Sequence, residues 1–419
     1  MRPATQPRLR DCLKQNNYNF LGSVPSRQMT MTAHPPVTRP RRGPLRASAG
    51  TLLLGIVLLT GASAMTGCAT TTEKKVARAT VFYPPLPNPP RIQYLATFSG
   101  PNDVGATRSV FLDFLMGKDS AETEAIKKPY GVAIHAGRIY VVDTRGGGYA
   151  VFDLQNRRFE VVQGSGGGKL LKPINITIEA DGTKYVTDTG REQVVVFDSQ
   201  DRYVRAYGAT GEFKPGDVAV FGDRVYISDL KHHDVQVLDK ETGKLLFKIG
   251  KAGSKEGEFV FPTNLAIGPD RGLYVADTGN FRVEKFTLDG KFVRSFGAIG
   301  AGFGQFARPK GVALDRDGRL YVVDAAFQNI QVLSPEGKLL MFFGSSGDDP
   351  ENINLPTQVV VDYHNLRYFQ PYADPKFKLE YVILVASQFG ASKVNVYGFG
   401  RMEGMDYDVT DAPARDNGR

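Results

Sequence analysis

Cysteine and tryptophan are almost absent from this chain of 419 residues, which has no Trp and only two Cys, Cys12 and Cys68. Both cysteines lie near the N-terminus, so the rest of the chain can form neither a disulfide nor a site with several cysteine ligands. The fold must therefore be held by its apolar core, and a chain of this length can bury a large one.

Histidine is also scarce, with five residues in the chain. His135 and His364 each follow a short apolar run, whereas His232 and His233 fall in a loop expected on the opposite face of the fold, so no histidine metal cluster is expected. The chain also lacks the Gly-x-Ser-x-Gly, phosphate-loop and Cys-x-x-Cys-His motifs. No nucleophile, nucleotide or haem site is therefore indicated.

The formal net charge of +8 would suit a nucleic-acid partner, but it is confined to one end of the chain. Residues 1–67 contain nine Lys and Arg and a single acid, Asp11, so the remainder is formally neutral. Because affinity for nucleic acid depends on cations that neutralise phosphates, we expect no nucleic acid as a partner.

Residues 1–67 have the composition of an export signal. Arginines up to Arg46 precede an uncharged apolar run at residues 51–64, which is shorter than a membrane span of about 20 residues. The next four residues, Met65-Thr66-Gly67-Cys68, resemble a bacterial lipobox, which implies lipid attachment at Cys68. An ordinary secretory signal followed by an incidental cysteine is the alternative.

Further expectations concern the segments on either side of the folded part. Residues 1–28 show no signal pattern, so translation is expected to start at Met29 or Met31. The lipobox resemblance implies the outer membrane, because Ala69 is not the Asp that retains many such proteins at the inner membrane. Closely spaced prolines favour an extended spacer. Residues 68–90 are therefore expected to form a lipidated tether, and the polar residues 401–419 a disordered tail.

Between residues 129 and 356 one block of sequence recurs six times. Each block begins with a proline, runs through a short apolar stretch and a turn to a second stretch ending in Asp, and continues with two more stretches. The prolines lie 42 to 47 residues apart: Pro129, Pro173, Pro215, Pro262, Pro309 and Pro356. Four short strands at this period are typical of a β-propeller with one blade per repeat. The predicted fold is thus an all-β, six-bladed β-propeller over residues 91–400.

The sixth block lacks a fourth strand of its own, because the chain loses the pattern after Phe399. An open strand edge in the last blade would invite aggregation. Residues 91–100 (RIQYLATFSG) share the pattern of residues 290–297 (GKFVRSFG). They are therefore predicted to supply the missing strand and to close the ring from the N-terminal side.

The fourth block also carries a family resemblance. Leu-Tyr-Val-Ala-Asp-Thr-Gly-Asn-Phe-Arg-Val at residues 273–283, followed by Phe-Gly at 296–297, resembles the NHL repeat. The six copies resemble a six-bladed NHL propeller, although the loops at residues 230–233 and 325–327 depart from the pattern. With the proline-rich segment before residue 91, the chain resembles bacterial propeller lipoproteins. This resemblance implies a fold and a membrane anchor but no particular activity.

One position of the repeat supplies a candidate binding site at the axial channel. Two residues after each proline lie Gly131, Asn175, Asp217, Asn264, Gly311 and Gln358. The four polar members, Asn175, Asp217, Asn264 and Gln358, would converge on one opening and bind a small molecule or, through Asp217, a divalent ion. The alternative is a water-filled channel whose polar side chains satisfy one another. No other cofactor is expected.

An aspartate ends the second strand in five blades, at Asp143, Asp188, Asp229, Asp277 and Asp324. Such a residue looks catalytic until its recurrence is noticed. Because a short carboxylate can accept backbone N–H groups in the turn that follows, we expect a structural role.

Two insertions interrupt the repeat and are candidates for contact with a partner. Residues 108–116 are apolar on nearly all sides, so they are expected to plug the channel mouth or to dock a partner through Phe111 and Phe114. Residues 363–381 carry rigid aromatic side chains suited to recognition, among them Tyr368, Phe369 and Tyr372. A self-packed loop is the alternative for this second insertion, which is expected on the face opposite the first.

These features favour a protein that is not an enzyme. The first hypothesis is a membrane-tethered propeller that serves as a scaffold for another protein of the bacterial cell envelope. The second is a metal-dependent lyase or lactone hydrolase, as the NHL resemblance allows, with its site at the mouth of the axial channel.

Overall fold

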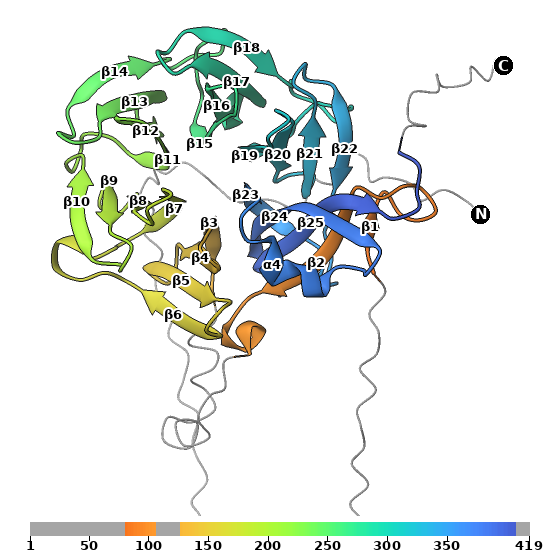
Figure 1. The fold of residues 1–419 in the computed structure, drawn as a ribbon. Helices are drawn as coiled ribbons and strands as arrows, with labels where there is room; N and C mark the ends of the chain where they lie inside the picture. Colours follow the sequence, from red (N-terminus) through yellow and green to blue (C-terminus); the bar gives the residue numbers. More distant parts are fainter. Residues whose placement is uncertain (1–79, 106–125, 408–419) are drawn as a thin grey trace, which may run out of the picture. The chain divides into compact units, whose positions relative to one another are not determined.

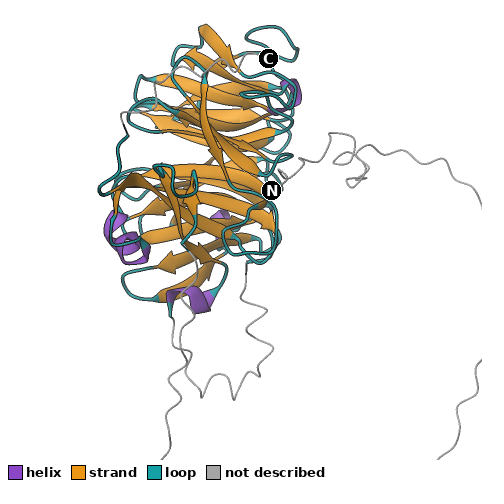
Figure 2. Cartoon of the chain, turned by 90° about the vertical axis from the view of Figure 1, so that its right-hand side faces the viewer, coloured by secondary structure: helices purple, strands orange, loops and turns teal. Residues whose placement is uncertain are grey.

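The computed structural model describes residues 80–105 and 126–407, which lie in one compact unit spanning residues 79–419. Their strands form six antiparallel sheets arranged around a common axis (Figure 1). The sequence-based prediction of an all-β, six-bladed propeller is confirmed. Helical segments in the described part are short and lie at the edges of the sheets (Figure 2), and none of them is long and apolar enough to cross a membrane.

Blades one to five each consist of four strands that follow one another along the chain. Their bounds are β3 (Pro129–His135), β4 (Arg138–Asp143), β5 (Gly148–Asp153) and β6 (Arg158–Val162) in blade one; β7 (Pro173–Ile178), β8 (Lys184–Asp188), β9 (Gln193–Phe197) and β10 (Tyr203–Tyr207) in blade two; β11 (Pro215–Phe221), β12 (Arg224–Asp229), β13 (Asp234–Asp239) and β14 (Leu245–Ile249) in blade three; β15 (Pro262–Ile267), β16 (Gly272–Asp277), β17 (Arg282–Thr287) and β18 (Phe292–Phe296) in blade four; and β19 (Pro309–Leu314), β20 (Leu320–Asp324), β21 (Asn329–Leu333) and β22 (Leu339–Phe343) in blade five.

Blade six is assembled from both ends of the propeller. Its strands are β23 (Asn354–Asp362), β24 (Phe377–Phe389), β25 (Val394–Met402) and, from the N-terminal side, β2 (Ile92–Phe98). Strand β2 pairs antiparallel with β25, with Ile92 opposite Phe399 and Phe98 opposite Val394. The predicted closing strand is therefore confirmed. It leaves β25 with a partner on both sides, so the ring has no open edge at this seam.

The folded part begins earlier and ends later than the sequence predicts. Strand β1 (Phe82–Tyr83) pairs with β2 as a fifth strand of blade six, so Phe82 and Tyr83 belong to the propeller, whereas residues 85–88 of the proline-rich segment are exposed. Phe82 packs against Phe377 and Met402. At the other end, Tyr407 Oη donates to Pro90 O at 2.8 Å, so the residues up to Tyr407 also lie against the fold.

The core is divided among the seams between blades. Six clusters of buried apolar side chains each join two neighbouring blades, including the seam between blades six and one. The alternation of β-branched and aromatic residues along each strand places one apolar face on each neighbouring sheet. Because the inner strands are neighbours in chain order and β23 lies beside β3, the ring is closed by packing as well as by hydrogen bonds.

Candidate functional site

The four predicted channel residues all lie where the inner strand bulges. In every blade the register of the inner strand shifts just after the repeated proline, for example between Pro173 and Asn175. A bulge re-aims the side chain that it contains. All four residues are buried, with exposed fractions of 0, 1, 0 and 7% for Asn175, Asp217, Asn264 and Gln358.

The two glycines at this position make room for the longer side chains beside them. A Cβ atom on Gly131 would lie 2.2 Å from Asn175 Oδ1, and one on Gly311 would lie 2.6 Å from Gln358 Oε1. The space at Gly311 allows Asn264 Nδ2 in blade four to donate to Gln358 Oε1 in blade six at 3.3 Å. The polar ring therefore links blades that are not neighbours.

Asp217 joins blade three to blade four. Its Oδ1 accepts from Val218 N at 2.8 Å and its Oδ2 from Leu265 N at 3.0 Å. Burial raises the pKa of Asp217 to about 7, although the hydrogen bonds from Leu265, Val218 and Asn264 favour the charged form. Both oxygens of this carboxylate are thus occupied, Oδ1 within its own strand and Oδ2 in holding the inner strands of blades three and four together.

Two atoms of the ring remain without a partner. Asn175 Nδ2 and Asn264 Oδ1 are buried and make no hydrogen bond within the described residues. Buried polar atoms in proteins are nearly always hydrogen-bonded to protein or water. Asn175 Nδ2 can therefore donate to a water molecule or a small ligand, and Asn264 Oδ1 can accept from one.

Sequence reasoning missed a second polar pair at the mouth of the channel, formed by Tyr130 and Lys310. Lys310 Nζ donates to Tyr130 Oη at 3.2 Å and lies 4.9 Å from the centroid of its ring. Burial, together with Arg308, lowers the pKa of Lys310 to about 7, and burial together with Asp217 raises the pKa of Tyr130. The sequence did contain a signal for this pair. Tyr130 and Lys310 directly follow their prolines, and these two blades are the ones in which the next residue is glycine.

The oxygen atoms of the ring do not fit a resident divalent ion. A hard cation such as Ca²⁺ takes six to eight oxygen ligands, yet Asp217 uses both of its oxygens and Gln358 Oε1 accepts from Asn264 and Val359. Asn175 Oδ1 accepts from Ile176 N. Only Asn264 Oδ1 is left, and residues 80–105 and 126–407 contain no group of three or more His, Cys, Asp or Glu that could hold a metal ion.

The recurring aspartates have the expected structural role. The carboxylates of Asp143, Asp188 and Asp324 each accept two N–H groups from the loop that enters their own blade, and further N–H groups from the turn after their strand. Asp229 and Asp277 accept one N–H each from the corresponding loop, those of Lys214 and Val260. These carboxylates therefore fix the loops that enter the blades.

The insertion of blade six is packed more tightly than a recognition loop would be. It forms α4 (Leu366–Phe369) and η4 (Gln370–Tyr372) before β24. Phe369, predicted as a partner contact, is fully buried with its ring 6.4 Å from that of Phe98 in the closing strand, so it anchors the insertion instead. Tyr368 Oη donates to Gln155 Oε1 of blade one at 3.1 Å. Tyr372 is half exposed and stays available.

A groove of about 410 Å³ lies beside this insertion, lined among others by Val104, Gly105, Tyr368, Pro371 and Tyr372. Gly105 is the last described residue before the first insertion. The predicted plug, with Phe111 and Phe114, lies outside the described residues, as does Cys68.

Exposed apolar side chains gather on the face of the ring where the six repeated prolines and the loops leading into them lie, here called the proline face. Phe261 directly precedes Pro262, Leu171 lies two residues before Pro173, and Ile299 and Phe303 lie in the loop before Pro309. Phe389 ends β24, opposite Asn354 and close to the sixth proline. Exposed fractions are 61% for Leu171, 52% for Phe261, 67% for Ile299, 87% for Phe303 and 50% for Phe389.

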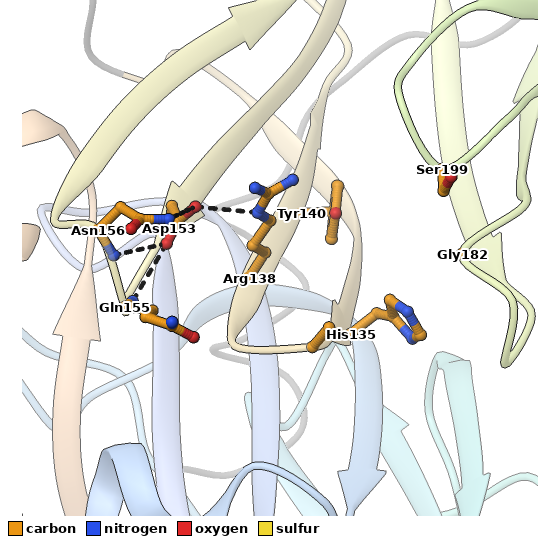
Figure 3. Close-up of a pocket in the computed structure, with 9 residues that line it drawn as sticks. His135, Arg138, Tyr140, Asp153, Gln155, Asn156, Gly182 and Ser199 are labelled. Atoms are coloured by element: carbon orange, nitrogen blue, oxygen red, sulfur yellow. Dashed lines mark hydrogen bonds and ion pairs between the residues drawn. The ribbon is translucent and has the colours of Figure 1, made fainter.

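A polar pocket of about 320 Å³ opens between blades one and two, at the end of the strands remote from the proline face. Figure 3 shows His135, Arg138 and Tyr140 of blade one on one side and Gly182 and Ser199 of blade two on the other. Arg138 Nε pairs with Asp153 Oδ2 at 2.9 Å. Sequence reasoning treated His135 only as a member of an unlikely metal cluster and did not identify this pocket.

Comparison with known proteins agrees with the fold. The NHL repeat pattern matches residues 259–286, in blade four, so the chain is a six-bladed β-propeller that contains an NHL repeat. Mouse peptidyl-glycine alpha-amidating monooxygenase is 30% identical over 153 residues, which is 32% of this chain and 16% of that protein. The chain thus matches only a small part of that relative's length.

Two solved propellers illustrate the structural likeness. A gluconolactonase from Xanthomonas campestris has a TM-score of 0.50 at 15% identity, over 75% of this chain and 91% of its own. An inactive virginiamycin B lyase from Staphylococcus aureus with quinupristin has a TM-score of 0.45 at 13% identity, over 65% of this chain and 96% of its own. At these identities the likeness concerns the fold alone.

Proposed function

We propose that this chain is a membrane-tethered NHL-type propeller that acts as a scaffold by binding another protein of the bacterial cell envelope through its proline face. The observation that carries the proposal is the exposure of that face. The four most exposed large hydrophobic side chains of the described part all lie there, namely Phe303, Ile299, Leu171 and Phe261. Exposed apolar and aromatic residues of this kind mark interaction surfaces and supply most of the binding energy at protein interfaces.

The loops that carry these side chains are held in place. Leu171 N donates to Asp188 Oδ2 at 2.7 Å, and Val260 N, next to Phe261, donates to Asp277 Oδ1 at 2.7 Å. The face is therefore ordered before a partner arrives, which reduces the entropy lost on binding. Tyr372, half exposed beside the groove at blade one, is a second candidate contact.

The tether is proposed from the sequence around Cys68. Because β1 already lies on blade six, the residues from 69 to 81 are what connects Cys68 to the folded part. Thirteen residues could span at most about 45 Å if fully extended. The proposed location is the outer membrane, with the lipid as the only membrane contact.

One crosslinking experiment tests both parts of the proposal. A photoreactive amino acid at position 303, introduced in intact cells, is expected to give a discrete adduct with another protein in the membrane fraction. Cys68→Ser should move the protein out of that fraction and remove the adduct, whereas Cys12→Ser should change neither. An adduct that is equally strong from position 221, on the opposite face, would contradict the use of the proline face.

The alternative is a lyase or lactone hydrolase acting at the channel mouth. Its support is the pair of unpartnered atoms, Asn175 Nδ2 and Asn264 Oδ1, together with the nearby residues Lys310 and Tyr130 of the inner strands. The oxygens of the ring, apart from Asn264 Oδ1, already accept hydrogen bonds within the inner strands or between them, so a metal-dependent version finds too few ligands there. Protein binding is the function that the described residues support better.

A further inference from the structure

Blades two, four and five share a polar arrangement at the end remote from the proline face. In blade two, Tyr185 Oη donates to Glu179 Oε2 at 2.6 Å, and Lys240 Nζ pairs with Glu179 Oε1 at 2.7 Å. The carboxylate therefore bridges the tyrosine of the second strand and a cation. Such a bridge satisfies a phenol that is otherwise buried.

Blades four and five repeat the arrangement. Asp270 Oδ2 accepts from Tyr274 Oη at 3.0 Å and pairs with Lys285 Nζ at 2.5 Å. In blade five, Asp315 Oδ2 accepts from Tyr321 Oη at 3.5 Å and pairs with Arg319 Nε at 2.5 Å. Blade three uses the backbone instead, since Tyr226 Oη donates to Leu288 O at 3.1 Å.

Blade one has the tyrosine and the cation but not the acid. Glu179 and Asp315 each follow directly on the inner strand's last apolar residue, and the equivalent residue in blade one is His135. Tyr140 has Arg138 beside its hydroxyl group, yet no carboxylate within the described residues is hydrogen-bonded to it. This is the seam at which the pocket of about 320 Å³ opens (Figure 3).

The carboxylates near this pocket, those of Asp153 and Asp201, already have other hydrogen-bond and ion-pair partners. Asp153 accepts from Arg138 Nε and from the backbone and side chain of Asn156. Asp201 accepts from Tyr149 Oη at 2.6 Å and pairs with Lys184 Nζ at 3.0 Å. Burial, together with the charge of Asp201, raises the pKa of Tyr140, so its hydroxyl group remains a donor.

We propose that this pocket binds a small hydroxylated carboxylic acid whose carboxylate takes the place that Glu179, Asp270 and Asp315 occupy in the other blades. The carboxylate accepts from Tyr140 and from the guanidinium nitrogens of Arg138 that Asp153 does not use, and His135 faces it from the end of β3. A bidentate or charge-assisted contact of this kind is the strongest that a carboxylate makes in a protein. The polar lining of Gln155, Asn156 and Ser199 suits hydroxyl groups on the rest of the ligand.

Titration calorimetry with glucuronate, lactate and benzoate, and with glucose as the uncharged counterpart of glucuronate, tests the proposal. The wild-type chain is expected to bind glucuronate saturably and glucose at least about tenfold more weakly. His135→Glu restores the acid of the other blades, so it should raise the melting temperature without ligand and weaken glucuronate binding by about tenfold or more. Phe221→Glu, at the equivalent position of blade three, is the matched control and should bind as the wild type does.

Tyr140→Phe is a second test variant, and it introduces no new charge into the pocket. It keeps the ring in the seam and removes the hydroxyl group, so glucuronate affinity should fall several-fold with little change in melting temperature. Equal binding of glucuronate and glucose, unchanged binding by both pocket variants, or no saturable binding of any probe to the wild type would each overturn the proposal. Partner binding at the proline face is independent of these outcomes.

Discussion

At the scale of single residues, the departures from the repeat are more informative than the repeat itself. Glu284 is an example, because the equivalent positions of blades three and five are Gln236 and Gln331. Gln236 Nε2 donates to Asp229 Oδ2 at 2.9 Å, whereas Glu284 is fully buried and places a second carboxylate near Asp277. Arg282 bridges the two acids, at 3.1 Å from each.

Glu284→Gln is therefore expected to change how stability depends on pH. Burial raises the pKa of Glu284 to about 7, although Arg282 favours the charged form. The folded-state pKa of Glu284 lies above that of an unfolded glutamate. The contribution of its protonated carboxyl group to the unfolding free energy is therefore complete below about pH 4 and is lost as the pH rises through 7. The wild type should lose up to about 3 kcal/mol of unfolding free energy over this window.

Denaturant unfolding at pH 5 and pH 8 measures the effect. Glu284→Gln should remove most of the difference between the two pH values. Exposed Glu256 lies in a nearby loop, and Glu256→Gln is the control that should leave the difference in place. A wild type as stable at pH 8 as at pH 5 would show that burial does not dominate at Glu284.

At the scale of elements, periodicity predicted the strands well, and long-range packing decided the rest. The prolines and the aspartates that end the second strands mark local signals, so the inner and second strands could be located from the sequence. Strand β1 could not, because its position depends on contacts such as those of Tyr83 with the rings of Phe343 and Tyr397. These partners lie more than 250 residues away in the chain, and a proline-rich segment gives no local indication of them.

The candidate site shows the same division. Counting two residues from each proline located the polar ring, because the position is defined by the repeat. The Tyr130 and Lys310 pair spans blades one and five, and the pocket at His135 depends on an acid that is missing relative to other blades. Both become visible only when side chains of different repeats are seen in contact.

The closing strand offers a direct test at this scale. Phe98 is buried in β2, and its ring lies 5.5 Å from that of Phe152 in blade one and 6.4 Å from that of Phe369. Phe98→Ala should therefore cost about 3–5 kcal/mol of unfolding free energy while the transition stays cooperative. Phe342→Ala, in an outer strand and half exposed, is the control and should cost under about 1 kcal/mol. If Phe98→Ala lowered the unfolding free energy no more than Phe342→Ala does, β2 would contribute little to closing the ring.

At the scale of the whole molecule, the repeated residues build the ring, and the proposed binding surfaces lie at its two ends: the proline face at one, and the pocket between blades one and two at the other. The aspartates, glycines and inner-strand bulges serve the ring, and the ring in turn fixes a set of apolar side chains on the proline face. The pocket between blades one and two lies at the other end of the strands, so a small ligand there and a protein on the proline face could be bound together. The two sites can thus be tested one at a time.

The central claim is that the proline face binds a different protein, and the mass of the detergent-solubilised complex tests it most directly. Wild-type protein, purified from the envelope and measured by light scattering on a sizing column, should exceed the mass of one chain, 45.9 kDa before processing, by the mass of a distinct partner. The double variant Ile299→Ser, Phe303→Ser should return to the mass of a single chain, and Phe221→Ser should behave as the wild type. A wild type that is monomeric or contains only copies of itself, or a double variant that keeps its partner, would contradict the account.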